Sequence, residues 1–198
     1  MRRLGNEMLY QQLAQPLAER LNALGVQRIV TCDPHALNSL RNELPEFGGK
    51  FEVLHHTQLM SQLLAQGRLK LQPKLQRVVF HDPCYLGRHN GEFEAPRQVL
   101  AALCSDAPLE FDLTREKAMC CGAGGGRMWL EETTGRRVNE LRVEQALATA
   151  PALIATACPY CAVMVGDGLG ALQPSTPVAS RDIAELVADA LLADAAVQ

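Results

Sequence analysis

Apolar residues follow two alternating patterns along the chain, one with the period of a helix and one with the short runs of buried strands. Residues 5–24 show the helical pattern, with an apolar stripe that includes Leu9, Leu13 and Leu17 and a proline at Pro16. A run of strand length follows at once, and the alternation continues almost to the C-terminus. Helices are predicted at residues 5–24, 35–43, 57–66, 95–103, 128–149, from Pro159 onward and from Arg181 onward after a Ser180 cap, and strands at residues 26–31, 51–55, 77–81, 109–113, 152–157 and 177–179.

This alternation predicts an α/β fold with Rossmann-like parallel sheets flanked by helices. Residues 69–75 read as a connector between two series of elements. In open α/β sheets, ligand sites form at the carboxyl ends of the strands. Residues that follow different strands are therefore expected to meet at one edge of a sheet.

Five cysteines occupy such positions. Cys84 follows the strand predicted at 77–81, the pair Cys120 and Cys121 follows the strand at 109–113, and Cys158 and Cys161 follow the strand at 152–157. Two adjacent thiolates cannot both serve one undistorted tetrahedral ion, whereas a polynuclear iron–sulfur cluster can use five thiolates. The pattern predicts one cluster site at the carboxyl ends of the strands.

The sequence around the cysteines supplies few side chains and several backbone amides. We expect the glycine-rich loop at residues 121–127 to place backbone N–H groups against the sulfurs, with Arg127 adding positive charge. Pro159 starts a helix whose N-terminus would face the same site. Arg115 and Lys117 are further candidates for positive charge. The predicted cofactor-binding residues are Gly122, Gly124, Gly125 and Arg127.

Other kinds of site remain open at this point. A structural zinc site could use four of the five cysteines, although such sites usually pair two short knuckles. A dithiol redox enzyme could use Cys158 and Cys161, which leaves the other three cysteines unexplained. The glycine loop lacks the ending of a phosphate-binding P-loop. A structural zinc-binding or interaction domain and a dithiol enzyme are therefore the alternatives.

Several residues near these motifs are assigned structural roles. Cys32 and Cys104 match no ligand spacing and are predicted to be buried small apolar residues. His81 is read as a partner of the ligands or a capping group rather than as a ligand. Met128 and Trp129 are expected to pack at the base of a helix.

Composition narrows the functional classes. The 198 residues include 47% hydrophobic and 21% charged residues, with a net charge of −3 and no long basic run, which excludes a nucleic-acid-binding interpretation. Acidic residues interrupt every long apolar stretch, so no membrane span is predicted. The N-terminal residues lack the apolar block of a secretory signal. Seven cysteines in such a chain indicate metal ligands in a reducing, cytoplasmic compartment.

The motifs as a whole resemble the CCG cysteine-rich domain family. This family includes a cysteine-rich subunit of heterodisulfide reductase, the glycolate oxidase iron–sulfur subunit and lactate-utilisation proteins, and the chain is similar to the branch associated with electron-transfer flavoprotein. The motifs that carry the resemblance are residues 81–88 (H-D-P-C-Y-L-G-R), residues 120–129 (C-C-G-A-G-G-G-R-M-W) and residues 155–159 (A-T-A-C-P).

The resemblance implies a [4Fe–4S] cluster, noncubane in form, held by five cysteines. By resemblance the metal ligands are Cys84, Cys120, Cys121, Cys158 and Cys161. It also implies an electron-transfer module of a larger oxidoreductase, either a subunit or a fragment. Electrons would pass between a flavoprotein or dehydrogenase and a quinone or disulfide acceptor. Such partners include a membrane-bound quinone-reducing protein, which would bring this cytoplasmic chain to the inner membrane.

The chain departs from the tandem arrangement of two CCG motifs that is usual in the family. Residues 30–38 resemble the end of a first motif, but Asp33 and Ala36 stand where its last two cysteines would be. The earlier ligands of that motif would lie upstream of Met1. We therefore expect residues 1–75 to be the remnant of a first, degenerate CCG-type half, and residues 76–198 to be the cysteine-rich CCG domain.

Overall fold

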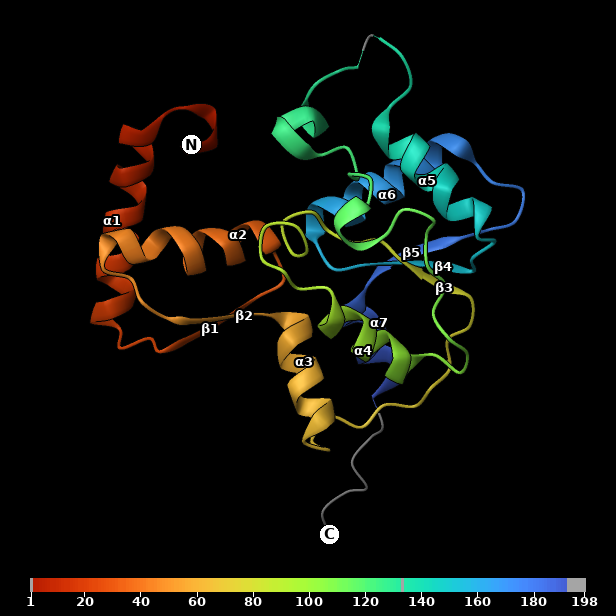
Figure 1. Ribbon diagram of the computed structural model, residues 1–198, viewed down its shortest axis with the longest axis horizontal. Coiled ribbons are helices and arrows are strands. Elements are labelled where there is room, and N and C mark those ends of the chain that lie inside the picture. The colour runs from red at the N-terminus through yellow and green to blue at the C-terminus, as the bar shows by residue number, and fades with distance from the viewer. Residues whose placement is uncertain (1, 133, 192–198) are drawn as a thin grey trace.

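The fold contains two small parallel sheets with helices packed around them (Figure 1). The computed structural model describes residues 2–132 and 134–191. In the first sheet, β1 (Arg28–Thr31) pairs with β2 (Glu52–His55). In the second, β4 (Leu153–Thr156) lies between β3 (Val78–Phe80) and β5 (Ala179–Asp182). The α/β class with parallel sheets flanked by helices is confirmed.

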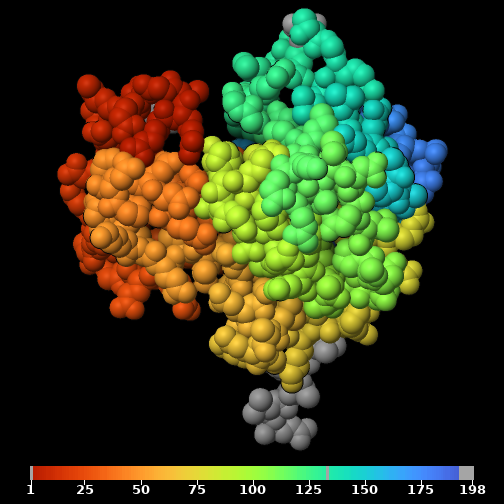
Figure 2. Space-filling view, viewed as in Figure 1, coloured from red at the N-terminus to blue at the C-terminus, as the bar shows by residue number. Residues whose placement is uncertain are grey.

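Seven α-helices connect and cover these strands. They are α1 (Glu7–Ala23), α2 (Pro34–Asn38), α3 (His56–Ala65), α4 (Glu94–Leu103), α5 (Val138–Ala148), α6 (Pro159–Leu172) and α7 (Ile183–Ala190) among the described residues. None of the helices within the described ranges is both long and apolar enough to cross a lipid bilayer. Figure 2 shows the N-terminal residues as a lobe beside the rest of the molecule.

In the second sheet, all residues of β3 and β4 are buried, and neighbouring residues of each strand point to opposite faces. Val78 and Phe80 of β3 belong to a core formed with α4 and α7, which includes Leu100 and Leu186. Val79, between them, packs into a second core together with side chains of α5 and α6. In Figure 1, α5 and α6 lie on one side of this sheet and α4 and α7 on the other. Because α6 follows β4 directly, its first residues lie at the carboxyl end of this sheet.

The order of elements around β1 recurs around β4. A helix, a strand, a helix, a strand and a helix follow one another as α1-β1-α2-β2-α3 and again as α5-β4-α6-β5-α7. The last residues of the paired strands are in register in both cases, Thr31 with His55 and Thr156 with Asp182. Proline occupies the first turn of both α2 and α6.

The helix predicted at 128–149 is wrong over its first part. Residues Gly124–Trp129 form a short 3-10 turn, and α5 begins only at Val138. Gly125 and Gly126 adopt φ values of 67° and 77°, a left-handed conformation that interrupts a helix. Trp129 is therefore 77% exposed instead of packing at a helix base.

Two smaller expectations also need correction. The strand predicted at 109–113 is reduced to one bridge between Leu109 and Val79. Ser180 lies in β5, and Asp182 caps α7 in a capping box with Glu185, because the strand ends at Asp182 and not at residue 179.

The apolar stripe of α1 differs from expectation in another way. Met8, Leu13 and Leu17 are exposed, whereas Ala14 and Ala18 face the core formed with Leu44. The small alanine side chains allow α1 to approach its neighbours closely. Much of the stripe that the leucine pattern indicates is therefore left at the surface of the described residues.

The crossing of α5 and α6 generates a stability prediction. A Cβ atom at Gly168 would lie 2.8 Å from Val143 Cγ2 and 3.0 Å from the Asn139 carbonyl oxygen. We expect Gly168→Ala to destabilise the fold, because overpacking costs about 1–3 kcal/mol while removing a helical glycine returns roughly 0.5–1 kcal/mol. Urea denaturation measures the difference.

Gly170 is the matched control in the same helix. A Cβ atom there meets no atom within 4 Å, so Gly170→Ala should stabilise the protein slightly. Equal midpoints for the two variants would show that the close crossing does not limit stability.

Candidate metal centre

Three segments of the chain bring the five cysteines together. Cys84 lies in the turn after β3, Cys120 and Cys121 lie in the loop between α4 and α5, and Cys158 and Cys161 lie at the start of α6. Cys121, Cys158 and Cys161 pack together with Cys120 against them, and the thiols of Cys84 and Cys120 lie close enough to shift each other's pKa. All five side chains thus form one continuous group of sulfurs.

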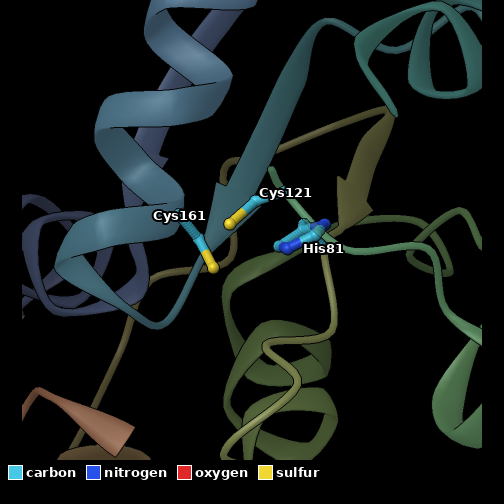
Figure 3. Close-up of side chains that lie close together, drawn as sticks. All are labelled: His81, Cys121 and Cys161. Carbon is cyan, nitrogen blue, oxygen red and sulfur yellow. The ribbon is translucent and has the colours of Figure 1, made fainter. Parts of the chain in front are cut away.

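The depth of the sulfurs varies along this group. Cys121, Cys158 and Cys161 are buried, whereas Cys84 and Cys120 are partly exposed. Figure 3 shows Cys121 and Cys161 directed toward each other with His81 beside them. The ligand atoms of these three residues lie within 4.8 Å of one another. The two short segments after β3 and β4 meet as the fold predicted, although the Cys120 loop does not follow a strand.

The contacts between thiols spread their pKa values widely. The hydrogen bond from Cys161, helped by His35, lowers the pKa of Cys158 to about 6 against the effect of burial. The hydrogen bond with Cys120 raises the pKa of Cys121 to about 12. Neighbouring like charges cannot form together without compensation. Full ionisation of this group therefore requires positive charge close to the sulfurs.

A backbone amide of the glycine loop reaches the sulfur of Cys120. The N–H of Gly122 donates to Cys120 Sγ at 3.3 Å, and a Cβ atom at Gly124 would lie 3.7 Å from the same sulfur. Gly122 adopts a φ of 98°, and a Cβ atom there would lie 3.1 Å from the backbone nitrogen of Asn139. Glycine is thus required at position 122 for both conformation and space.

The remaining loop residues lie further from the sulfurs than expected. Gly125 is exposed at the outer turn of the loop, and the guanidinium of the exposed Arg127 pairs with Glu132 at 2.5 Å. Arg115 pairs with Glu94, and Lys117 is exposed. The sequence thus predicted the amides of this loop better than its positive charges.

A buried arginine that sequence reasoning missed supplies charge beside the cysteines. Arg142 of α5 is 1% exposed, lies 3.5 Å from the centre of the Phe111 ring, and donates its Nε–H to His81 Nδ1 at 3.0 Å. Burial lowers the pKa of Arg142 to about 10, which leaves it a cation at neutral pH. The charges of Cys161 and Cys121 act on it in the opposite direction. Nothing in its sequence context distinguishes it from an ordinary helix residue.

His81 is held in place by this arginine. Burial and the charge of Arg142 lower the pKa of His81 to about 3, so the imidazole is neutral. Its Nδ1 accepts the arginine hydrogen bond, and the ring lies against the sulfurs of Cys121 and Cys161. This position agrees with the prediction of a supporting residue next to the ligands.

Arg88 and Asp82 fix the loop that carries the cysteine pair. The Arg88 Nη1 group donates to the carbonyls of Glu116 and Ala118, just before Cys120. Asp82 accepts two hydrogen bonds from Arg97, one from the Thr114 hydroxyl and one from the backbone N–H of Arg115. Both residues lie in the 81–88 motif, which was the signal that could have identified them.

The two cysteines outside the group behave differently. Cys104 is buried at 6% exposure, as predicted, and packs with α4 in the core. Cys32 is exposed, so its predicted burial is wrong. It follows β1, whose sheet has two strands and whose residues alternate between exposed and half-buried positions.

Comparisons with known proteins agree with this geometry. Residues 78–166 match the family model described as CCG, cysteine-rich domain, which includes all five clustered cysteines.

Three relatives illustrate the wider similarity. A probable iron–sulfur-binding oxidoreductase of Bacillus subtilis, FadF, is 46% identical over 96% of this chain and 27% of its own length. The EtfAB:quinone oxidoreductase of Syntrophomonas wolfei is 41% identical over 94% of this chain and 27% of its own length. One subunit of the dihydromethanophenazine:CoB–CoM heterodisulfide reductase of Methanosarcina barkeri is 35% identical over 91% and 44%. The chain therefore spans less than half the length of each.

The buried Asp82 pair generates a second prediction. Asp82→Ala removes the buried carboxylate partner of Arg97 and leaves that arginine only the partly exposed Glu110, so the loss should destabilise the protein by about 3–5 kcal/mol, as for other buried pairs. Burial alone would raise the pKa of Asp82, but the Arg97 guanidinium holds it below the ordinary value of 3.8. The difference in the free energy of unfolding between wild type and variant should be largest at neutral pH. It should shrink as the pH falls through the pKa of Asp82 in the folded protein. Urea denaturation of the metal-free protein between neutral and acidic pH measures it.

Glu94→Gln is the control because the Glu94–Arg115 pair is exposed. Its cost should stay below about 1 kcal/mol. Comparable losses in the two variants would contradict an anchoring role for Asp82.

Proposed function

Because residues 78–166 form a CCG cysteine-rich domain, we propose that this chain binds one iron–sulfur cluster and relays electrons within a larger oxidoreductase. The proposed ligands are Cys84, Cys120, Cys121, Cys158 and Cys161. The observation that carries the proposal is the continuous contact of five thiols from three separate segments. Thiolates are the usual protein ligands of iron–sulfur clusters.

The adjacent cysteines Cys120 and Cys121 have different sulfur neighbours, which favours a polynuclear centre over a single ion. The thiol of Cys120 acts on the pKa of Cys84, whereas Cys121 Sγ lies within 4.8 Å of Cys161 Sγ. The adjacent side chains therefore serve opposite ends of the sulfur group. One tetrahedral zinc ion takes four ligands around a single point, while a cluster with several irons can take five along its length. A noncubane [4Fe–4S] cluster is the form we propose.

The residues around the sulfurs suit a centre that changes charge by one electron. A bound cluster would accept and release single electrons. The amide of Gly122 stabilises negative charge on Cys120, and the buried Arg142 stabilises it near Cys121 and Cys161. Hydrogen bonds to the sulfurs, net charge and solvent exposure set the reduction potential of such centres. The burial of three of the five sulfurs limits the access of water.

The names of the relatives suggest the partners. They include an iron–sulfur-binding oxidoreductase, an EtfAB:quinone oxidoreductase and a component of a heterodisulfide reductase. We therefore infer that the chain passes electrons between a flavoprotein or dehydrogenase and a quinone or disulfide acceptor. Other subunits or segments would supply those activities. The chain would work in the cytoplasm, next to the inner membrane through its partners.

The recurring order of elements supports the proposed division of the chain. We propose that residues 1–75 are the remnant of a first CCG-type half and that residues 76–198 are the cysteine-rich domain. Asp33 caps α2 at the position that Cys158 occupies before α6, and a proline follows each of them. The first half thus has the turn that carries a ligand in the second half, without the cysteine.

Reconstitution tests the proposed function. After anaerobic incubation with iron and sulfide, the wild-type protein should contain both elements and give an iron–sulfur EPR signal. Cys121→Ser should abolish or convert the signal, because it removes a buried sulfur at the centre of the group. Iron and sulfide analysis together with EPR measures both results.

Cys104→Ser is the matched control, since Cys104 is buried but lies outside the sulfur group. Its spectrum should equal that of the wild type. Stoichiometric zinc with no sulfide in the wild-type protein would favour a structural zinc domain. Identical spectra for wild type and Cys121→Ser would refute the ligand assignment.

A further inference from the structure

The first half of the chain reaches the sulfur group through a histidine. A ring nitrogen of His35, an oxygen of Asp33 and the sulfur of Cys158 all lie within 4.8 Å of one another. His35 belongs to α2, whereas Cys158 precedes α6. These residues come from the two halves and meet where the starts of the two corresponding helices face each other.

Asp33 holds the imidazole of His35 in a defined orientation. Its Oδ1 accepts a hydrogen bond from the backbone N–H of His35 and lies 2.9 Å from His35 Nδ1. A carboxylate bound to one nitrogen of an imidazole is the usual arrangement behind a histidine that acts on a metal centre. The cap of a short helix thus also orients a side chain toward the cysteines.

Two tyrosines confine the His35 ring. The ring centre lies 4.2 Å from that of Tyr85 and 5.0 Å from that of Tyr160. Tyr85 follows Cys84, and Tyr160 lies between Cys158 and Cys161. The histidine is therefore packed against the same segments that carry three of the sulfurs, which leaves it little freedom to turn away.

We propose that His35, positioned by Asp33, hydrogen-bonds to the sulfur of Cys158 and thereby raises the reduction potential of the cluster. The proposal rests on the cluster binding proposed above. A ring N–H that His35 donates to Cys158 Sγ stabilises negative charge on that sulfur, while the Asp33 carboxylate keeps the ring in place. Hydrogen bonds of this kind favour the more negative, reduced state of an iron–sulfur centre.

The contact of His35 with Cys158 joins a side chain of the first half to a sulfur of the second. The first half would therefore be functionally necessary to the second, although Asp33 and Ala36 occupy the positions of its own former ligands.

EPR-monitored redox titration of the reconstituted protein tests this role. We expect His35→Leu to bind as much iron and sulfide as wild type but to be reduced at a lower potential. The change should be about tenfold in the one-electron equilibrium, which corresponds to about 59 mV. His35→Gln keeps an N–H donor and should fall between the two. Circular dichroism verifies that each variant is folded. If His35→Leu does not fold, the midpoint potential of His35→Gln tests the proposal instead.

His89→Leu is the matched control. His89 stacks on the same tyrosine, with its ring centre 4.3 Å from that of Tyr85, but it does not belong to the group formed by Asp33, His35 and Cys158. Its midpoint potential should equal that of the wild type. A shift of the same size in His89→Leu would assign the effect to packing on Tyr85 and overturn the proposal.

The outcomes separate the two proposals. A wild-type protein that takes up no iron and sulfide contradicts the proposed function, and with it the inference about His35. A wild type with a cluster, combined with folded His35 variants that have unchanged midpoint potentials, contradicts the inference alone.

Discussion

The structure depends on one constraint: five cysteine thiols gather in a largely buried site, where their negative charges would repel one another. Sulfurs that touch one another cannot all ionise unless cations or N–H groups lie close by. The groups near the sulfurs suit this requirement: the amide of Gly122 donates to Cys120, Arg142 lies near Cys121 and Cys161, and a ring nitrogen of His35 lies within 4.8 Å of Cys158 Sγ. The sheet and its helices matter for function mainly because they hold these groups in fixed positions.

Much of the fold could be predicted from sequence because local patterns determine it. The runs that became β1, β3 and β4 are short and followed by turn residues, and a proline marks the start of both α2 and α6. The region between Cys121 and α5 could not be predicted in the same way. Its apolar spacing imitates a helix, while the conformation is decided by glycines that adopt positive φ. Sequence periodicity carries no information on that choice.

The candidate site likewise contains residues that could be predicted from sequence and residues that could not. The cysteines and the loop amides were visible because they lie in motifs with characteristic spacing. Arg142 and His35 were not, because their importance depends on tertiary contacts with residues far away in sequence. Arg127 illustrates the converse error, since proximity in sequence to Cys121 did not bring its charge to the sulfurs. Charge compensation in a site assembled from three segments is a property of the fold.

The uneven burial of the sulfurs gives the group an outer and an inner end. Cys84 and Cys120 are partly exposed, while Cys121, Cys158 and Cys161 lie beneath them. Metal delivered from solution and oxidants that attack thiols both meet the outer pair first. Metal insertion and thiol oxidation would then both begin at Cys84 and Cys120. The Arg88 and Asp82 contacts hold the loop that carries Cys120 and would limit its movement. A loop that shields the inner sulfurs from oxygen would also slow the insertion of iron.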